Sequence, residues 1–413
     1  MRIGIVSQWY PPEPVHIPAT LAGELARRGH EVRVLTGLPT YPEGRLYPGY
    51  RQRWRNRTSA GQVTVRRVPL YPSHDGSGAR RAVTYLSFAA TSSAAATRFL
   101  AGVDAVYVYL TPATAAAAAA VARLVHRAPM VVHVQDLWPE SVTASSMAPA
   151  GRAGRLLDRA LHAAMRRLYQ ASAGIAVIAP SMRDIVVARG AAPERVRVVF
   201  NWADEAVFAP TAPATERLGL PGRCTIMYAG TMGPFQNVED SVRAAAAVEH
   251  ADAIDLVLVG SGTAERSART LATQLRARNV HFLGRRGVRD MPALYAAADF
   301  QLITLRDLPI FRGTVPSKLQ AAMACGSPVI VAVPGDAAAL VENAGAGLAC
   351  PPGDWRALAD CFLRAAKLPA AERAETGQRA RACYTATMSL RAGVDAVEEM
   401  LHDAARPRGR RRR

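Results

Sequence analysis

The stretch IGIVSQWYPPEPVHIPATLAGELARRGHEVRVLTG, residues 3–37, contains two short apolar runs on either side of a helical segment. The runs IGIV and EVRVLTG are typical of buried strands, and ATLAGELARRGH between them is typical of an amphipathic helix. Gly29 stands where this helix would end, a position that favours a left-handed residue. The order strand, helix, strand predicts the beginning of a parallel sheet.

The same alternation continues along the chain and restarts after a linker. In the first half, strand segments such as VDAVYVYL, MVVHVQ, GIAVIA and RVRVVF alternate with Ala-rich helical segments. A Pro-, Ala- and Thr-rich segment near 208–222 precedes a second series, TIMYAGTM, IDLVLVGSG, VHFLG, FQLITL and PVIVAV. Because 413 residues exceed one hydrophobic core, we predict an α/β protein with two doubly wound, Rossmann-like domains facing an interdomain cleft. Ligands are expected at the carboxyl ends of the strands.

The formal net charge of +18 raises the question of an anionic partner, and RPRGRRRR, 406–413, concentrates six arginines. No stretch interleaves basic residues with aromatic ones as nucleic-acid readers do, so we expect no nucleic-acid partner. Anionic lipid head groups attract such tails by about 1 kcal/mol per basic residue. The tail therefore indicates either contact with an anionic membrane surface or a solvated terminus.

Cysteine usage indicates a reducing compartment, and the hydropathy pattern bears on membrane segments. The five cysteines show no metal-ligand spacing, which predicts no metal site. The first apolar run is too short for a signal peptide, and Ser and Thr dilute the segment 83–100, which predicts a helix rather than a membrane span. We expect a cytoplasmic protein, peripheral at the inner face of the membrane if the tail binds lipid. The cysteines are Cys224, Cys325, Cys350, Cys361 and Cys383.

Three strand ends in the second half carry glycine. Glycine lets backbone N–H groups approach phosphate oxygens at a helix N-terminus. One such loop is better explained by turn geometry, but three together indicate that this half holds a nucleotide. The residues concerned are Gly230, Thr231, Gly233, Gly260, Gly262, Gly284 and Arg285.

TVPSKLQAAMACGSPV, 314–329, contains Lys318, one of two lysines in the chain. Pro316 is favoured at a helix start, so Ser317 and Lys318 stand where free N–H groups are presented. A lysine is unfavourable there because the helix dipole prefers carboxylates. The combination indicates that an anion such as a diphosphate binds at this point, and a solvated lysine is the alternative.

Aromatic and carboxylate residues follow the strands of the first half. They occur in QWYPPEP, 8–14, in PTYPEGRLYPGY, 39–50, and in QDLWPES, 135–141. Carboxylates accept hydrogen bonds from sugar hydroxyls, and rings stack on sugar C–H faces. We expect these loops to bind a sugar acceptor, although Trp138 could instead pack between domains. The acceptor candidates are Glu13, His16, Tyr41, Trp138 and Glu140.

In order along the chain, ten motifs resemble family 4 glycosyltransferases of the GT-B fold. They are QWYPPEP, LARRGHEVRVLTGLPTYPEGRLYPGY, YLSF, QDLWPES, FNWADEAVF, YAGTMG, LVGSG, FLGRR, VPSK and NAGAGL. They are most similar to the bacterial subgroup of hexosaminyl or deoxyhexosyl transferases in O-antigen, capsule and colanic-acid assembly. The resemblance implies an acceptor-binding domain at 1–204, a nucleotide-sugar-binding domain at 205–385, a helix at 386–405 that crosses back to the first domain, and the basic tail at 406–413.

The resemblance also implies a retaining, metal-independent transfer from a nucleotide diphosphate sugar, with a UDP-sugar favoured and no cofactor. Backbone N–H groups and fixed cations must then neutralise the leaving group. Lys318, the Ser317 N–H and the Gly230–Gly233 loop are expected to do so. Further expected donor contacts are Arg285, Arg312 and Leu319.

The chain departs from the family pattern at three places. Val15 and His16 replace a glycine pair after the first strand. Many members have His at the position of Asp136, whereas the subgroup has Asp, as this chain does. Asp136 is the candidate for orienting or deprotonating the acceptor hydroxyl. Ala321 and Gly313 replace the expected carboxylates, the first of which would bind ribose hydroxyls.

These observations favour a glycosyltransferase that moves an amino sugar or deoxysugar to a polyprenyl-linked saccharide or a natural-product acceptor. A degenerate transferase acting as a scaffold or partner activator is the alternative, and it gains weight from Ala321. A nucleotide-sugar epimerase shares the architecture, but its acid and base residues find no place in this sequence.

Overall fold

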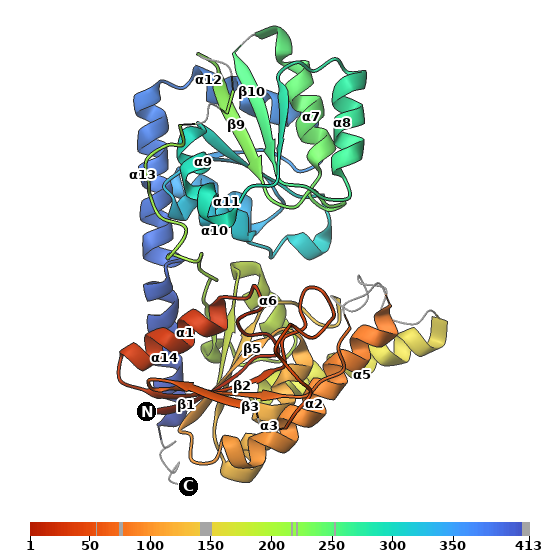
Figure 1. Ribbon diagram of the computed structural model, residues 1–413, viewed down its shortest axis with the longest axis vertical. Helices are drawn as coiled ribbons and strands as arrows, with labels where there is room; N and C mark the ends of the chain where they lie inside the picture. The colour runs from red at the N-terminus through yellow and green to blue at the C-terminus, as the bar shows by residue number, and fades with distance from the viewer. Residues whose placement is uncertain are drawn as a thin grey trace. The chain divides into compact units, whose positions relative to one another are not determined.

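The computed structural model describes residues 1–54, 56–73, 77–140, 151–215, 218–219, 222–251 and 253–406, which form two compact units (Figure 1). The first unit comprises Met1–Val199 and the C-terminal segment from Gly393, and the second comprises Phe200–Ala392. The units change over at Val199, slightly before the expected boundary at 204. Of the expected basic tail, 407–413 lies outside the described residues.

The described strands of the first unit form one sheet in the order β3-β4-β2-β1-β5-β6-β7-β8. Neighbours pair in parallel, except that β3 and β4 form an antiparallel hairpin. Ile5 of β1 pairs with Val34 of β2 and with Tyr107 of β5, so the strand order reverses beside β1. The strands are β1 (Arg2–Val6), β2 (Glu31–Gly37), β3 (Asn56–Ala60), β4 (Val63–Val68), β5 (Ala105–Leu110), β6 (Met130–Val134), β7 (Gly174–Val177) and β8 (Val196–Val198).

Helices cover this sheet because its central strands are apolar throughout. Every residue of β5, β6 and β7 is buried, as expected for parallel strands with both faces covered. The helices of this unit are α1 (Ile17–Arg27), α2 (Gly78–Phe99), α3 (Ala116–His126), α5 (Gly151–Ala171), α6 (Pro180–Ala188) and α14 (Leu390–Ala405), the last of which begins in the second unit.

Helix α14 is held to the first unit by charged side chains. Glu398 accepts from His30 at 2.6 Å and from Arg28 at 2.5 Å, and Arg197 pairs with Glu399 and Asp403. The helix begins at Leu390 rather than 386, because the preceding helix continues to Thr387 and the Ser389 hydroxyl accepts from the Ala392 N–H at 3.1 Å, as an N-cap does.

The second unit contains a fully parallel sheet of order β11-β10-β9-β12-β13-β14 in its described residues. The strand order reverses between β9 and β12, and a doubly wound sheet binds its ligand beside such a point. The prediction of two doubly wound α/β domains is confirmed. The strands are β9 (Cys224–Ala229), β10 (Ile254–Val259), β11 (Val280–Gly284), β12 (Phe300–Thr304), β13 (Val329–Ala332) and β14 (Gly347–Ala349).

Helices α7 and α8 lie on one side of this sheet, and α9, α10 and α11 lie on the other (Figure 1). Val242 of α7 and Phe362 of α12 belong to one buried cluster with Tyr228 and Leu258 of the sheet. The helices are α7 (Val238–Ala247), α8 (Glu265–Gln274), α9 (Met291–Ala297), α10 (Ser317–Ala324), α11 (Asp336–Ala344), α12 (Trp355–Lys367) and α13 (Ala370–Thr387).

The apolar segment 83–100 lies mostly in α2, whose Phe88, Ala95 and Phe99 are buried. Among the described helices, none is long and apolar enough to cross a membrane.

Candidate active site

Three glycine-bearing loops of the second unit are bonded to one another at the carboxyl edge of its sheet. The Gly230 N–H donates to Val259 at 2.9 Å, the Gly260 N–H donates to Gly284 at 2.8 Å, and the Met232 N–H donates to Ser261 at 2.9 Å. The loops after β9, β10 and β11 therefore form one backbone surface.

Two of these glycines are required by the close approach of the loops. Gly260 has φ +132°, and a Cβ there would collide with the carbonyl oxygen of Gly230. Gly262 has φ +157°, and a Cβ there would collide with the carbonyl oxygen of Met232. Packing of one loop on the next thus accounts for both residues.

Gly230 also has a positive φ, +137°, and a Cβ at this position would be in ordinary van der Waals contact with the Lys318 side chain, with Cε and Nζ each 3.7 Å away. The Lys318 ammonium donates to the Tyr228 hydroxyl at 2.8 Å and lies 4.0 Å from the centroid of that ring. Burial lowers the pKa of Lys318 to about 7. No carboxylate pairs with Lys318 among the described residues, so an anion beside Gly230 would supply the missing counter-charge.

Lys318 lies in the first turn of α10. Intrahelical bonding starts with the Leu319 N–H, which donates to Pro316, so the N–H groups of Ser317 and Lys318 precede the bonded part of the helix. Ser317 is exposed. Leu319 is fully buried in the core, and Ala321 is also buried.

The other donor candidates differ in how they are connected to the glycine loops. Arg285 joins two of the glycine loops, because its Nε donates to the Ser261 hydroxyl at 2.5 Å. Thr231 takes part through its carbonyl, which accepts from the Tyr228 hydroxyl at 2.6 Å. The Gly233 N–H donates to the side chain of Gln236 at 3.1 Å. Arg312 is exposed, and its carbonyl accepts from the Asp336 N–H at the start of α11.

In the first unit, Asp136 follows β6 and accepts from the Thr111 hydroxyl, which follows the neighbouring β5, at 3.1 Å. Burial raises the pKa of the Asp136 carboxyl, and the Thr111 hydrogen bond opposes this effect. Burial also raises the pKa values of Tyr85 and Tyr109, and the charge of Asp136 adds to both increases. The carboxylate therefore bonds the Thr111 hydroxyl, interacts electrostatically with both tyrosines, and is exposed to solvent.

Glu13 connects two loops of this unit. Its buried carboxylate accepts from the N–H groups of Tyr10 at 3.0 Å, Thr40 at 2.8 Å and Tyr41 at 2.8 Å. Burial raises its pKa in spite of these bonds. The carboxylate thus orders the loops on which an acceptor would bind, and Tyr41 packs on Trp9 with ring centroids 5.1 Å apart. His16 adjoins α1, and its carbonyl accepts from the Thr20 N–H at 2.9 Å.

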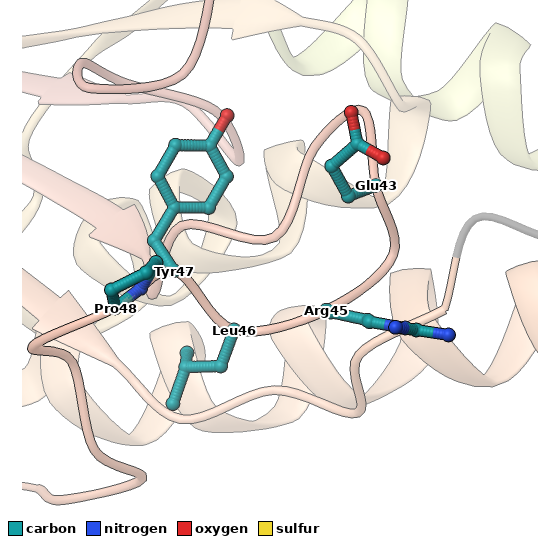
Figure 2. A pocket seen from close by; sticks show the side chains of 5 residues that line it. All are labelled: Glu43, Arg45, Leu46, Tyr47 and Pro48. Atoms are coloured by element: carbon teal, nitrogen blue, oxygen red, sulfur yellow. The ribbon is translucent and has the colours of Figure 1, made fainter.

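The loop that follows Tyr41 borders a hollow of about 600 Å³, which Figure 2 shows from close by. The side chains of Glu43 and Tyr47 point to the same side of this loop, whereas that of Arg45 extends away. The Tyr47 hydroxyl donates to the Tyr41 carbonyl at 2.8 Å, which ties the loop to the acceptor candidates. The lining residues are Glu43, Arg45, Leu46, Tyr47 and Pro48.

Trp138 and Glu140 have partners inside the first unit. Trp138 is buried, with its ring 6.4 Å from that of Tyr85. Arg189 donates to the Trp138 carbonyl at 2.8 Å and forms an ion pair with Glu140. These contacts fix the segment just after Asp136, and they place Trp138 in local packing.

The residues that our sequence reasoning missed are Tyr228, Ser261 and Thr111. Each contacts a candidate residue through a hydroxyl group. Tyr228 occurs within an apolar strand segment, so its sequence context indicates core packing. Thr111 offered a usable signal, since it directly follows a strand that adjoins the strand before Asp136.

Family models match both units. The "Glycosyl transferase 4-like domain" matches residues 17–202, and "Glycosyl transferases group 1" matches residues 223–367. Two doubly wound units, each matched by a glycosyl transferase model, define a two-domain group-transfer enzyme. The chain belongs to these glycosyl transferase families and is a glycosyltransferase of the GT-B fold.

Curated relatives agree with this assignment. The Escherichia coli (strain K12) protein named as a colanic acid biosynthesis glycosyl transferase, WcaI, is 28% identical over 319 residues, which is 74% of this chain and 76% of WcaI. The D-inositol 3-phosphate glycosyltransferase of Saccharomonospora viridis is 31% identical over 52% of this chain and 51% of its own length.

Solved structures share the fold across nearly the whole chain. HepE of Anabaena in complex with UDP has a TM-score of 0.70 at 18% identity, covering 97% of this chain and 100% of HepE. Sucrose-phosphate synthase from Thermosynechococcus elongatus has a TM-score of 0.72 at 18% identity, covering 97% of this chain and 98% of that enzyme. HepE has also been crystallised with UDP-glucose.

Proposed function

We propose that this glycosyltransferase transfers an amino sugar or a deoxysugar from a UDP-sugar, with retention of configuration, to a polyprenyl-linked saccharide or a natural-product acceptor. The observation that carries the proposal is Lys318, whose ammonium lies beside Gly230 with no carboxylate partner in the described part of the chain. A diphosphate supplies two negative charges at the place where this cation and the first N–H groups of α10 meet.

Similar proteins support the uridine nucleotide and the saccharide acceptor of this proposal. HepE, which shares the fold, binds UDP and UDP-glucose, and this favours a uridine nucleotide. WcaI is named for the biosynthesis of colanic acid, a polysaccharide, and this favours a saccharide acceptor.

In the proposed reaction, the bond between the anomeric carbon and the diphosphate breaks, and the acceptor oxygen bonds to the same face of that carbon. Lys318, the Ser317 N–H and the Gly230 loop meet the charge that develops on the leaving diphosphate. Asp136 takes the proton of the acceptor hydroxyl, or it orients that hydroxyl while the leaving diphosphate takes the proton. The raised pKa of Asp136 makes it a better base than an ordinary aspartate. The residues named for these steps need no metal ion or cofactor.

We further propose that the cytoplasmic enzyme contacts an anionic membrane surface. Helix α5 carries the exposed arginines Arg152, Arg155 and Arg159, and Leu156 beside them is 64% exposed. Cations on an amphipathic helix are attracted to anionic lipid, and a neighbouring apolar side chain can insert among the head groups. The tail 407–413 would add to this charge.

The test is a panel of nucleotide sugars offered with lipid-linked and soluble acceptors, with release of nucleoside diphosphate as the readout. The proposal expects acceptor-dependent release of UDP from at least one amino sugar or deoxysugar donor. If no donor is turned over or bound, the transfer proposal fails and the scaffold alternative, motivated by the missing carboxylate at Ala321, takes its place.

A further inference from the structure

Tyr228 of β9 stands where the glycine loops of the second unit meet Lys318. Its ring is fully buried. Its hydroxyl donates to the Thr231 carbonyl at 2.6 Å and accepts from the Lys318 ammonium at 2.8 Å. One side chain therefore joins the loop after β9 to the first turn of α10.

The chemical nature of Tyr228 also determines how it affects the charge of Lys318. A tyrosine offers the ammonium a hydroxyl lone pair and the negative face of a ring, and both favour the charged amine without carrying a formal charge. A carboxylate in the same place would neutralise the lysine and compete with any anion that approached it. Tyr228 thus localises the cation and leaves its charge available.

The position of the ammonium is also restricted on the side of the loop. A Cβ at Gly230 would lie 3.7 Å from Lys318 Cε and Nζ, an ordinary van der Waals distance, so the amine lies close against this loop. The Gly230 carbonyl is in turn packed against Gly260, so the loop cannot easily move away. Tyr228 on one side and Gly230 on the other define where the amine stands.

We propose that Tyr228 is a positioning residue for the donor: it holds the Lys318 amine against Gly230 without a counter-ion, so that the diphosphate of the nucleotide completes the site. This inference rests on the proposed function of the same site. It assigns a role in donor binding to a side chain that would otherwise be counted as core.

The two lysines of the chain make a direct test feasible. Lys367, at the end of α12, is exposed and serves as an internal reference for Lys318. The intact protein is acylated with an amine-directed reagent between pH 6 and pH 10, with and without UDP, and mass spectrometry follows the two lysine peptides. UDP should slow the acylation of Lys318 and leave that of Lys367 unchanged.

The decisive variant is Tyr228→Phe, which keeps the ring and removes the hydroxyl. The dissociation constant for UDP should rise about tenfold, as expected for the loss of a hydrogen bond to a charged group. The pH midpoint of Lys318 acylation should also move. The midpoint should fall if the amine stays buried beside the ring without the hydroxyl as hydrogen-bond acceptor. The midpoint should rise if the amine moves into solvent.

A matched control is Tyr295→Phe, because Tyr295 is another buried tyrosine of the second unit whose ring stacks on Phe208, 6.1 Å away. It should retain the wild-type UDP affinity and Lys318 profile. Thermal unfolding of all three proteins ensures that binding is measured on folded protein.

Two results would overturn the inference and are distinguishable. If wild type binds UDP and UDP protects Lys318, but Tyr228→Phe has the same affinity and the same acylation profile, then Tyr228 has only a packing role and the proposed function stands. If no nucleoside diphosphate protects Lys318 in the wild type, the proposed donor site fails and the inference fails with it.

Discussion

Lys318 and Asp136, one in each unit, carry opposite charges but are held in similar ways. The ammonium donates to the Tyr228 hydroxyl at 2.8 Å, and the carboxylate accepts from the Thr111 hydroxyl at 3.1 Å. Neither forms an ion pair within the described residues. Burial moves both pKa values toward the neutral form, downward to about 7 for Lys318 and upward for Asp136.

Their surroundings differ, and this difference indicates a division of labour. Lys318 lies between the uncharged Tyr228 side chain and the Gly230 loop, which leaves N–H groups and one positive charge for an anion. Asp136 bonds the Thr111 hydroxyl and interacts electrostatically with Tyr85 and Tyr109, which suits a neutral ligand rich in hydroxyls. The two edges therefore suit the two kinds of substrate in the proposed transfer.

The largest effect is expected from Gly260→Ala, which attacks the backbone surface around Lys318. A Cβ would collide with the Gly230 carbonyl at a residue with φ +132°, so overpacking and strain together should lower the free energy of unfolding by about 4 kcal/mol. Urea denaturation measures this change. In Gly23→Ala, the control, the added Cβ meets nothing within 4 Å on the exposed face of α1, and stability should stay the same or rise. Equal stability of both variants would contradict the packing of the loops.

Asp136→Asn should separate chemistry from donor binding. The amide keeps an acceptor for Thr111 but cannot take a proton, so kcat should fall about 10³-fold. The dissociation constant for UDP, measured by calorimetry, should not change. Asp184→Asn, which alters an exposed carboxylate on α6, controls for the loss of one negative charge. A variant that retains wild-type kcat would remove Asp136 from the reaction.

Lys318→Ala should weaken both binding and chemistry, in contrast to Asp136→Asn. Loss of the cation should raise the barrier by about 2–4 kcal/mol and also weaken UDP binding, because the charge acts on the diphosphate before and during its departure. Steady-state kinetics and calorimetry give the two quantities. Lys367→Ala changes the other, exposed lysine and should behave like wild type. If the two lysine variants are equally active, Lys318 is not part of the site.

The sequence was most informative where local chemistry decides the structure. Strand alternation predicted both sheets, and glycine at strand ends located the loops after β9, β10 and β11. It could not reveal that Gly260 and Gly262 are needed by contacts between loops, because each contact joins residues about 30 positions apart.

Partners far apart in the chain explain most of what was missed. Tyr228 meets Lys318 across 90 positions, and within its own strand it has the pattern of a core residue. Glu13 and Glu140 occur at the expected strand ends, but the sequence did not show that backbone N–H groups and Arg189, respectively, already bind them. Side-chain type predicts the chemistry available at a site, whereas tertiary contacts decide which groups remain open to a ligand.

The smallest predicted effect is the pH dependence of UDP binding, which should distinguish Lys318 from Asp136. UDP binding favours protonated Lys318, whose pKa in the free enzyme is about 7, so affinity should be highest below that pH and fall as the pH rises. Above pH 7 the UDP phosphates are already ionised, and the dissociation constant should increase by up to about tenfold per pH unit until the pKa of the bound state is reached.

Lys318→Arg provides the control for this titration, because a guanidinium stays charged over the whole range and should give a flat profile. Asp136→Asn should keep the wild-type slope of binding, since the carboxylate acts on the acceptor. Turnover requires Asp136 to be ionised and Lys318 to be protonated, so kcat/KM should depend on pH as a bell-shaped curve. Asp136 should determine the acid limb of the curve and Lys318 the alkaline limb. An alkaline limb that persists in Lys318→Arg would assign that titration to another group.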